Sequence, residues 1–233
     1  MSTYLELCKD VVRECRRVSG DNPATVVDQV GVLLDIVRVT AKAWDLIQSE
    51  ERTWLWMRKA LPATALTTIG VANYAASIWA VTDHNEWIRN PRDRVGPYSI
   101  YENAAGNAQE GFLQFIEYDD WYRAFNVGPQ TNAQPIYWSI SPTNEFLVGP
   151  LPDKVYRIRG PYQKSNQALT LDADVPECPA KYHPTIVRRG LILLAAHDEN
   201  QFGIVVNQKE YVEGMDTLRR EQLPRVSMGG PVA

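Results

Sequence analysis

The sequence contains little that could build a catalytic or metal centre. It has only three histidines, and none stands in an HExxH motif or at the spacing of a metal-ligand set. The phosphate-binding patterns GxGxxG and GxxxxGK[ST] are absent, as is the GxSxG turn of many hydrolases. These absences speak against a nucleotide-dependent enzyme, a zinc enzyme and a serine hydrolase. We therefore expect no cofactor, no metal and no catalytic activity.

Two of the histidines border a segment with helical periodicity. His183 precedes Pro184 at the start of that segment, and His197 lies at its end. Polar residues at helix ends commonly cap the helix or face solvent. We expect both imidazoles to be caps or surface groups.

Cysteine and long apolar runs are also scarce. Cys8 and Cys15 are seven residues apart in a segment with helical spacing, which separates them by about 10 Å, too far for a disulfide. With Cys178 they are expected to be reduced, buried thiols, typical of a reducing compartment. No window approaches the ~18 apolar residues of a membrane helix, and MSTYLELCKD lacks the apolar core of a signal peptide. We expect no membrane partner.

The charge balance is mildly acidic. The chain carries 24 Lys and Arg against 28 Asp and Glu, a formal net charge of −4. A dedicated nucleic-acid-binding protein is normally basic, whereas an acidic surface repels phosphate and can border DNA without retaining it. Seven Trp and eleven Tyr indicate extensive packed or contacting aromatic surface.

The hydrophobic pattern changes twice along the chain. Apolar residues recur at helical spacing over residues 2–18 and 28–50, and again over residues 182–199 and 207–222. The region between these pairs holds short β-branched and aromatic runs broken by Gly, Pro and Asn, typical of strands joined by turns. Neither amphipathic pair can bury its apolar face alone, so the two pairs are expected to pack together.

We therefore predict an α+β protein with a small helical bundle formed by the N- and C-terminal helix pairs and an inserted antiparallel β domain. Residues 1–52 and 180–223 are assigned to the bundle, and residues 53–179 to the β-rich domain. Residues 224–233 are assigned to a flexible C-terminal tail, because they show no periodicity and offer little to bury.

One acidic cluster offers a function of a different class. The stretch IEYDDWYRAF places Glu117, Asp119 and Asp120 beside Trp121 and Tyr122. Paired carboxylates next to aromatic rings can bind or cleave sugars, so a carbohydrate-binding or glycoside-cleaving module is one alternative. The simpler interpretation is a solvated turn between a strand and the next segment.

Four segments carry a family resemblance. They read PATVVDQVGVLLDIVRVTAKAWDLIQSEERTWLWMR, PIYWSISPTNEFLVGPLPDKVYRIRGPYQ, LTLDADVPECPAKYHPTIVRRGLILLAAHDE and MDTLRREQLP. In this order they resemble the head-to-tail adaptor (connector) proteins of tailed bacteriophages, particularly those of short-tailed phages. The resemblance covers about half of the chain and rests on structural patterns without a catalytic signature.

The resemblance implies a structural virion protein, assembled in the host cytoplasm and located at the head–tail interface. Such proteins form a ring, usually of twelve copies, that joins the portal protein to a downstream tail or nozzle protein. Genomic DNA passes through the ring without specific binding. Helices line the ring, the β lobe faces the next tail component, and the C-terminal extension reaches the portal. A tail-tube, tail-completion or head-completion protein is the alternative within the virion.

Two sets of interface residues are predicted on this basis. The portal contact is assigned to the C-terminal residues Leu223, Pro224, Arg225, Val226 and Met228. The subunit contact is assigned to four arginines that strand and helix periodicity place on outer faces. They are Arg157, Arg159, Arg188 and Arg189.

Overall fold

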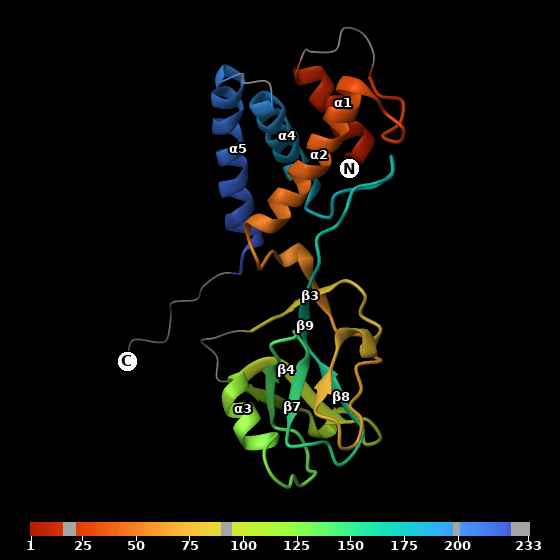
Figure 1. Ribbon diagram of the computed structural model, residues 1–233, viewed down its shortest axis with the longest axis vertical. Helices are drawn as coiled ribbons and strands as arrows, with labels where there is room; N and C mark the ends of the chain where they lie inside the picture. Colours follow the sequence, from red (N-terminus) through yellow and green to blue (C-terminus); the bar gives the residue numbers. More distant parts are fainter. Residues whose placement is uncertain (16–21, 90–94, 198–200, 225–233) are drawn as a thin grey trace, which may run out of the picture. The chain divides into compact units, whose positions relative to one another are not determined.

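The computed structural model in Figure 1 describes residues 1–15, 22–89, 95–197 and 201–224. As predicted, the chain is α+β. It divides into two compact units, one made of Met1–Met57 with the residues from Asn166 onward, the other of Arg58–Ser165. We refer to them as the helical unit and the β unit.

The helical unit is organised around one central helix. Its α-helices in the described residues are α1 (Tyr4–Cys15), α2 (Gly31–Glu50), α4 (His183–His197) and α5 (Gln201–Gln222), with short 3-10 helices η1 (Leu55–Met57) and η4 (Ala180–Tyr182). Helix α4 packs against α1, α2 and α5. The apolar run GLILLAA lies in α4. A helix that is buried on several sides must carry apolar side chains on all of those sides, and this run supplies them.

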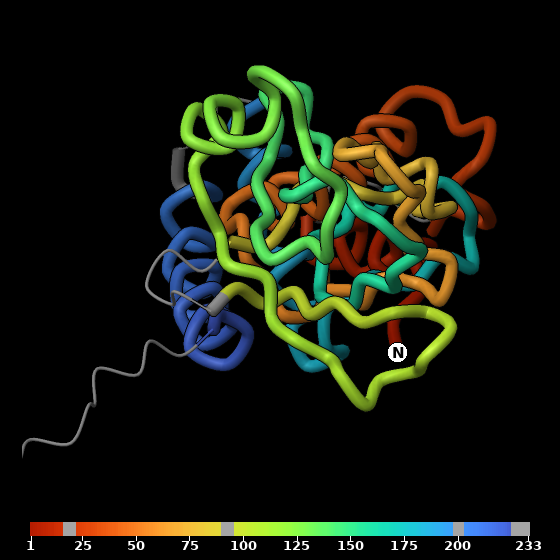
Figure 2. Tube along the Cα trace, turned by 90° about the horizontal axis from the view of Figure 1, so that it is seen from below, coloured from red at the N-terminus to blue at the C-terminus, as the bar shows by residue number. Residues whose placement is uncertain are grey.

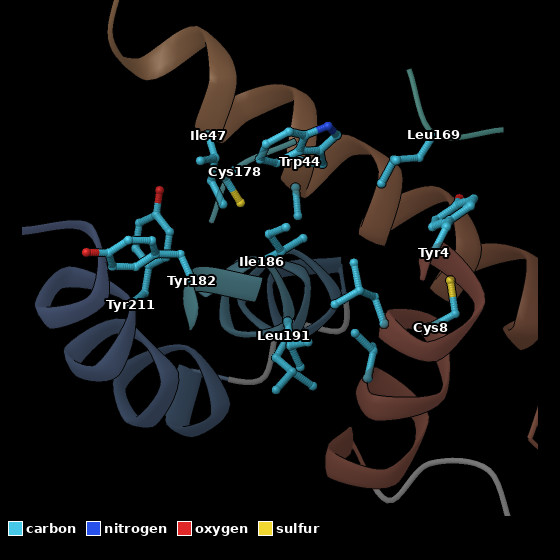
Figure 3. Close-up of a cluster of buried hydrophobic side chains, with 14 of the residues drawn as sticks. Tyr4, Cys8, Trp44, Ile47, Leu169, Cys178, Tyr182, Ile186, Leu191 and Tyr211 are labelled. Carbon is cyan, nitrogen blue, oxygen red and sulfur yellow. The ribbon is translucent and has the colours of Figure 1, made fainter. Parts of the chain in front are cut away.

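Side chains from all four of these helices meet in one hydrophobic core, seen along α4 in Figure 3. The core includes Tyr4, Cys8, Trp44, Ile47, Ile186, Leu191 and Tyr211. Segments from the two ends of the sequence therefore complete one another's apolar faces, as the amphipathic pattern requires.

The extended segment 166–179 belongs to the helical unit, although its composition assigned it to the β-rich region. The Gln48 side chain accepts a hydrogen bond from the Gln167 backbone N–H (2.7 Å) and donates one to its carbonyl (3.0 Å). The Asp172 carboxylate accepts from the Val26 N–H at 2.6 Å, and Leu169 is buried in the helical core. Side-chain bonds of this kind replace a strand ladder, and short-range sequence patterns do not reveal them.

The β unit contains two sheets. The three-stranded sheet has the order β1 (Arg58–Ala60), β9 (Pro161–Lys164), β3 (His84–Trp87). The six-stranded sheet has the order β2 (Asn73–Tyr74), β7 (Phe146–Gly149), β6 (Tyr137–Ile140), β5 (Gly111–Phe115), β4 (Val95–Glu102), β8 (Tyr156–Arg159). The remaining elements are η2 (Ala76–Trp79), η3 (Asn107–Gln109) and helix α3 (Tyr118–Phe125).

The prediction of a purely antiparallel β domain is wrong for one strand pair. Strands β5 and β6 pair in parallel, with Gln114 opposite Tyr137 and Phe115 opposite Trp138. Parallel neighbours need a crossover connection, and α3 with its flanking loops supplies it. Figure 2 shows the β4–β5 hairpin in yellow-green and the path from β5 into α3.

The core of the β unit is mainly aromatic. Trp138 stacks on Phe146 with ring centroids 5.2 Å apart, and Tyr98 meets Trp138 edge-on at 4.5 Å. The Tyr98 ring lies so close to Gly160 that a Cβ there would approach it to 2.1 Å, so this strand junction requires glycine. This core buries three of the seven Trp and four of the eleven Tyr, and the helical core buries two more Trp and three more Tyr.

Candidate interaction surfaces

Strand β8 shows the predicted alternation. Tyr156 (3% exposed) and Ile158 (0%) point into the core, whereas Arg157 and Arg159 lie on the opposite face. The Arg159 guanidinium forms an ion pair with Glu110 at 3.2 Å and lies 4.9 Å from the centre of the Tyr101 ring. Its side chain nevertheless remains 45% exposed.

An exposed aromatic side chain lies on the same sheet face as these arginines. Ser99 on β4 pairs with Phe112 on β5 and with Arg159 on β8, so the three residues form a row across adjacent strands. Phe112 is 64% exposed. We call the surface formed by Phe112, Arg157 and Arg159 the sheet face. An aromatic ring beside arginine is the composition enriched at protein interfaces.

Sequence reasoning missed Phe112, although a signal was available. Phe112 and Leu113 are adjacent in a strand, and successive side chains point to opposite faces. One of the two apolar side chains must therefore leave the core, unless the second face is also covered. The structure buries Leu113 completely and leaves Phe112 outside.

The helical arginines bind partners within the chain. Arg188 on α4 pairs with Glu14 of α1 and with Glu210 of α5, the latter at 2.5 Å. The Arg189 guanidinium lies 5.1 Å from the centre of the Tyr211 ring on α5. Both side chains thus tie α4 to its neighbours, and their role in a subunit interface stays a prediction.

The C-terminal residues are described as far as Pro224. Leu223 is half-buried against the helical core, and its backbone N–H donates to the Arg219 carbonyl at 3.0 Å. Arg225, Val226 and Met228 lie outside the described residues. The assignment of these residues to a portal contact remains a prediction.

The acidic cluster forms the start of the short helix α3 where a turn was the simpler interpretation, and its two aspartates are solvated as expected. Glu117 precedes α3 and pairs with Arg89 at 3.1 Å, while Asp119 and Asp120 are exposed in its first turn. Trp121 is buried, and its indole N–H donates to the Val148 carbonyl at 3.1 Å. This indole therefore cannot form a stacking platform for a sugar, and the geometry does not favour the carbohydrate alternative.

His183 contradicts the expectation of a surface or capping histidine. It is 1% exposed, and its Nδ1 accepts a hydrogen bond from the Ser2 N–H at 3.2 Å. Burial lowers its pKa below the ordinary value. The reason is the position of α4, whose first turn is enclosed in the helical core. His197, at the other end of α4, is exposed as expected.

The cysteines are free, as predicted. Cys8 and Cys178 are buried as expected, whereas Cys15 is only half-buried, so the expectation of a buried thiol is wrong there. Burial raises the pKa of the Cys8 and Cys178 thiols to about 12, which keeps them protonated at neutral pH. The described residues form no cluster of His, Cys, Asp and Glu that could hold a metal ion. In the part of the chain that the structure covers, no helix combines the length and apolar character needed to cross a membrane.

The exposed surfaces that carry aromatic and arginine side chains indicate a structural protein that contacts other proteins. Comparison with known families supports this class. Residues 2–233 match the model of the family described as SU10 adaptor protein, so the chain belongs to that family. The resemblance to bacteriophage head-to-tail adaptor proteins is thereby confirmed. No curated protein matches the sequence.

Proposed function

We propose that the protein joins the portal to the tail of a bacteriophage as a ring at the head–tail interface of the virion, without enzymatic activity. The observation that carries this proposal is the family match over residues 2–233, which spans both units. Assembly takes place in the host cytoplasm, and the copy number implied by the family resemblance is twelve.

The charge of the chain supports a role as a DNA conduit. Each copy carries a formal net charge of −4, and a ring multiplies this charge around its axis. A like-charged lining repels phosphate, so genomic DNA passes without being retained.

The exposed surfaces supply candidate contacts between copies and with the tail. The sheet face presents Phe112 with Arg157 and Arg159, and aromatic and arginine side chains dominate the binding energy of many interfaces. In this proposal the terminal helices form a bundle that builds the ring. The β unit is directed to the downstream tail or nozzle protein.

The portal contact is assigned to residues 223–233. A segment that orders against its partner loses entropy, and repetition around a ring offsets that loss through avidity. Deletion of residues 224–233 is expected to leave the circular dichroism spectrum and unfolding transition intact, because Leu223 and the residues before it remain. Binding to portal rings in co-sedimentation is expected to be lost.

A matched control replaces residues 225–233 by the same residues in scrambled order. This variant keeps the length and composition of the segment. If both the deletion and the scrambled variant lose portal binding, the portal recognises the order of the residues in this segment. Undiminished portal binding by the truncated protein contradicts the assignment of this contact.

A further inference from the structure

Helix α5 carries apolar side chains on the side that faces away from α4. Tyr211, Met215 and Leu218 are buried in the helical core, whereas Val205 is 70% exposed and Val212 is 43% exposed. The exposed valines border a shallow, open hollow of about 560 Å³. It is lined by Ile204, Val205, Gln208, Lys209, Val212 and Glu213. The solvent side of a helix is normally polar, and an exposed apolar patch on it marks a site of interaction with another protein.

The same surface contains two charges. Lys209 lies one turn after Val205, and Glu213 lies one turn after Lys209. Within the described residues, neither side chain takes part in an ion pair. We call Val205, Lys209, Val212 and Glu213 the α5 outer face.

A second exposed apolar surface lies at the start of α2. Val30 is 80% exposed and Val32 is 46% exposed. Asp35 and Arg38 follow on the outer side of the same helix, and the described part of the chain gives neither of them an ion-pair partner. We call Val30, Val32, Asp35 and Arg38 the α2 entry surface.

The two surfaces are complementary in the order of their charges. The α5 outer face reads apolar, basic, acidic at positions 205, 209 and 213, whereas the α2 entry surface reads apolar, acidic, basic at positions 32, 35 and 38. The steps are about 6 Å on α5 and about 4.5 Å on α2, a difference that flexible Lys and Arg side chains can span. Placed side by side in parallel, Lys209 faces Asp35 and Glu213 faces Arg38.

The two helices also run in matching directions. Arg219 near the end of α5 pairs with Glu50 (3.6 Å) and Glu51 (2.9 Å) at the end of α2, so both helices end in the same region of the helical unit. Figures 1 and 3 both show α5 on one side of α4 and α1 on the other, with the start of α2 beside α1. The two complementary surfaces therefore lie on opposite flanks of the helical unit.

We infer that the α5 outer face of one copy docks against the α2 entry surface of the next copy. Two different surfaces on opposite flanks give a head-to-tail contact, which generates rings when the rotation between copies closes. This inference rests on the proposed ring and names the surfaces that build it. The occupant is a second copy, because the complementary surface is present on the same unit with matching polarity and direction.

Cross-linking between single cysteines tests the contact. The variants Val205→Cys and Val32→Cys are made in a Cys15→Ser background, in which the two remaining native thiols are buried. A short bismaleimide is applied to concentrated protein and to protein bound to portal rings. Mixing the two variants is expected to give a covalent heterodimer, and a chain carrying both cysteines is expected to give a ladder of oligomers. Each variant alone is expected to stay monomeric on a denaturing gel.

The control pair combines Val32→Cys with Ile78→Cys, because Ile78 is 60% exposed and lies in the β unit. Cross-linking of the test pair no stronger than that of the control pair, in both free and portal-bound protein, overturns the inference. A homodimer of Val205→Cys alone also overturns it, because that product requires a self-facing contact.

Charge reversal gives a second test. Lys209→Glu is expected to lower the ladder yield about fivefold, since an attraction becomes a repulsion. Adding Asp35→Lys is expected to restore the yield, and failure of this rescue contradicts the assigned pairing. If cross-linked oligomers form but the protein does not bind portal rings, the proposed function is refuted and the α5–α2 contact is supported. If the protein binds portal rings but no cross-linked oligomers form, only the α5–α2 contact is refuted.

Discussion

The helical unit draws its core from both ends of the chain, whereas the β unit draws its core from the continuous stretch Arg58–Ser165. The difference extends to chemistry. The helical core is mostly aliphatic along α4, and the β core is a cluster of Trp, Tyr and Phe rings. A unit made from one continuous stretch can complete its contacts by itself, but the helical unit needs segments that are more than a hundred residues apart.

The aromatic residues of the β unit also fix its loops. The Trp79 indole donates to the Leu66 carbonyl and the Trp87 indole to the Asn144 carbonyl, both at 3.0 Å. The Tyr98 hydroxyl donates to the Pro161 carbonyl at 2.7 Å. Each ring thus packs in the core and satisfies a backbone carbonyl, which lies in a loop for the two tryptophans and in strand β9 for Tyr98.

The largest expected effect comes from separating the units. A chain consisting of Arg58–Ser165 is expected to unfold cooperatively in urea and to keep the near-ultraviolet circular dichroism of its packed aromatic rings. A chain ending at Ser165 is expected to lose most of the helicity of α1 and α2, because α4 no longer covers them. Circular dichroism of both fragments is the measurement. Full helicity without α4 and α5 would contradict the dependence of α1 and α2 on α4. A β fragment without a cooperative transition would contradict an independently folding β unit.

A smaller effect is expected from alanine substitutions at two glycines of the helical unit, which should change its stability in opposite directions. A Cβ on Gly214 would lie 2.5 Å from the Thr185 Oγ1, whereas one on Gly190 meets its nearest neighbour, Val11, at 3.5 Å. Gly214→Ala is therefore expected to destabilise the unit by about 1 kcal/mol, since crowding exceeds the gain in helix propensity. Gly190→Ala is expected to stabilise it by about 1 kcal/mol, because the added methyl fits.

Urea unfolding of the two variants measures these changes in the free energy of unfolding. Thr185→Ala serves as the partner in a double-mutant cycle, because it removes the atoms that crowd Gly214. In the Thr185→Ala background, Gly214→Ala is expected to cost nothing. A persistent cost there contradicts close packing of α4 and α5 at this position.

The smallest expected effect is a pH dependence in each unit. His183 in the helical unit and His84 in the β unit both have pKa values lowered mainly by burial. Each unfolded histidine, with its ordinary pKa of about 6.5, takes up a proton before the folded one does. Stability is therefore fully present above about pH 6.5 and declines as the pH falls below it.

Substitution of each histidine by Gln shows which histidine causes the pH dependence of stability in each unit. His183→Gln is expected to flatten the pH dependence of the helical transition only, and His84→Gln that of the β transition only. His197→Gln is the control, since His197 is exposed at the end of α4. Unfolding is followed by far-ultraviolet and near-ultraviolet circular dichroism across the acid range. An unchanged slope in His183→Gln contradicts a buried neutral imidazole.

The parts of the fold that the sequence predicts are those set by local periodicity. The segments 2–18 and 182–199 contain α1 and α4, and alternation in β8 places Tyr156 and Ile158 inside. Helix α5 begins at Gln201, six residues before the predicted start at residue 207. Its first turns carry the exposed residues Val205 and Val206, so this part of the helix has no polar outer side for the periodicity to reveal. Periodicity describes amphipathic helices and loses its signal when both sides carry apolar residues.

The remaining features depend on contacts between distant segments. The parallel pairing of β5 with β6 follows from the α3 crossover, and the place of residues 166–179 follows from hydrogen bonds to α2 and the Val26 backbone. Burial of His183 depends on the packing of Ser2 against α4. Of the four arginines selected from sequence, Arg157 and Arg159 lie on one face as predicted, whereas Arg188 and Arg189 bind partners in their own chain.

The ring proposed for this member of the SU10 adaptor family assembles beneath a portal through the helical units. Electron microscopy of the protein mixed with portal rings tests this proposal. We expect an added ring of density on the portal, in which α5 of each copy contacts the start of α2 in the next. Portal particles without added density, at protein concentrations that saturate co-sedimentation of known adaptors, would contradict it.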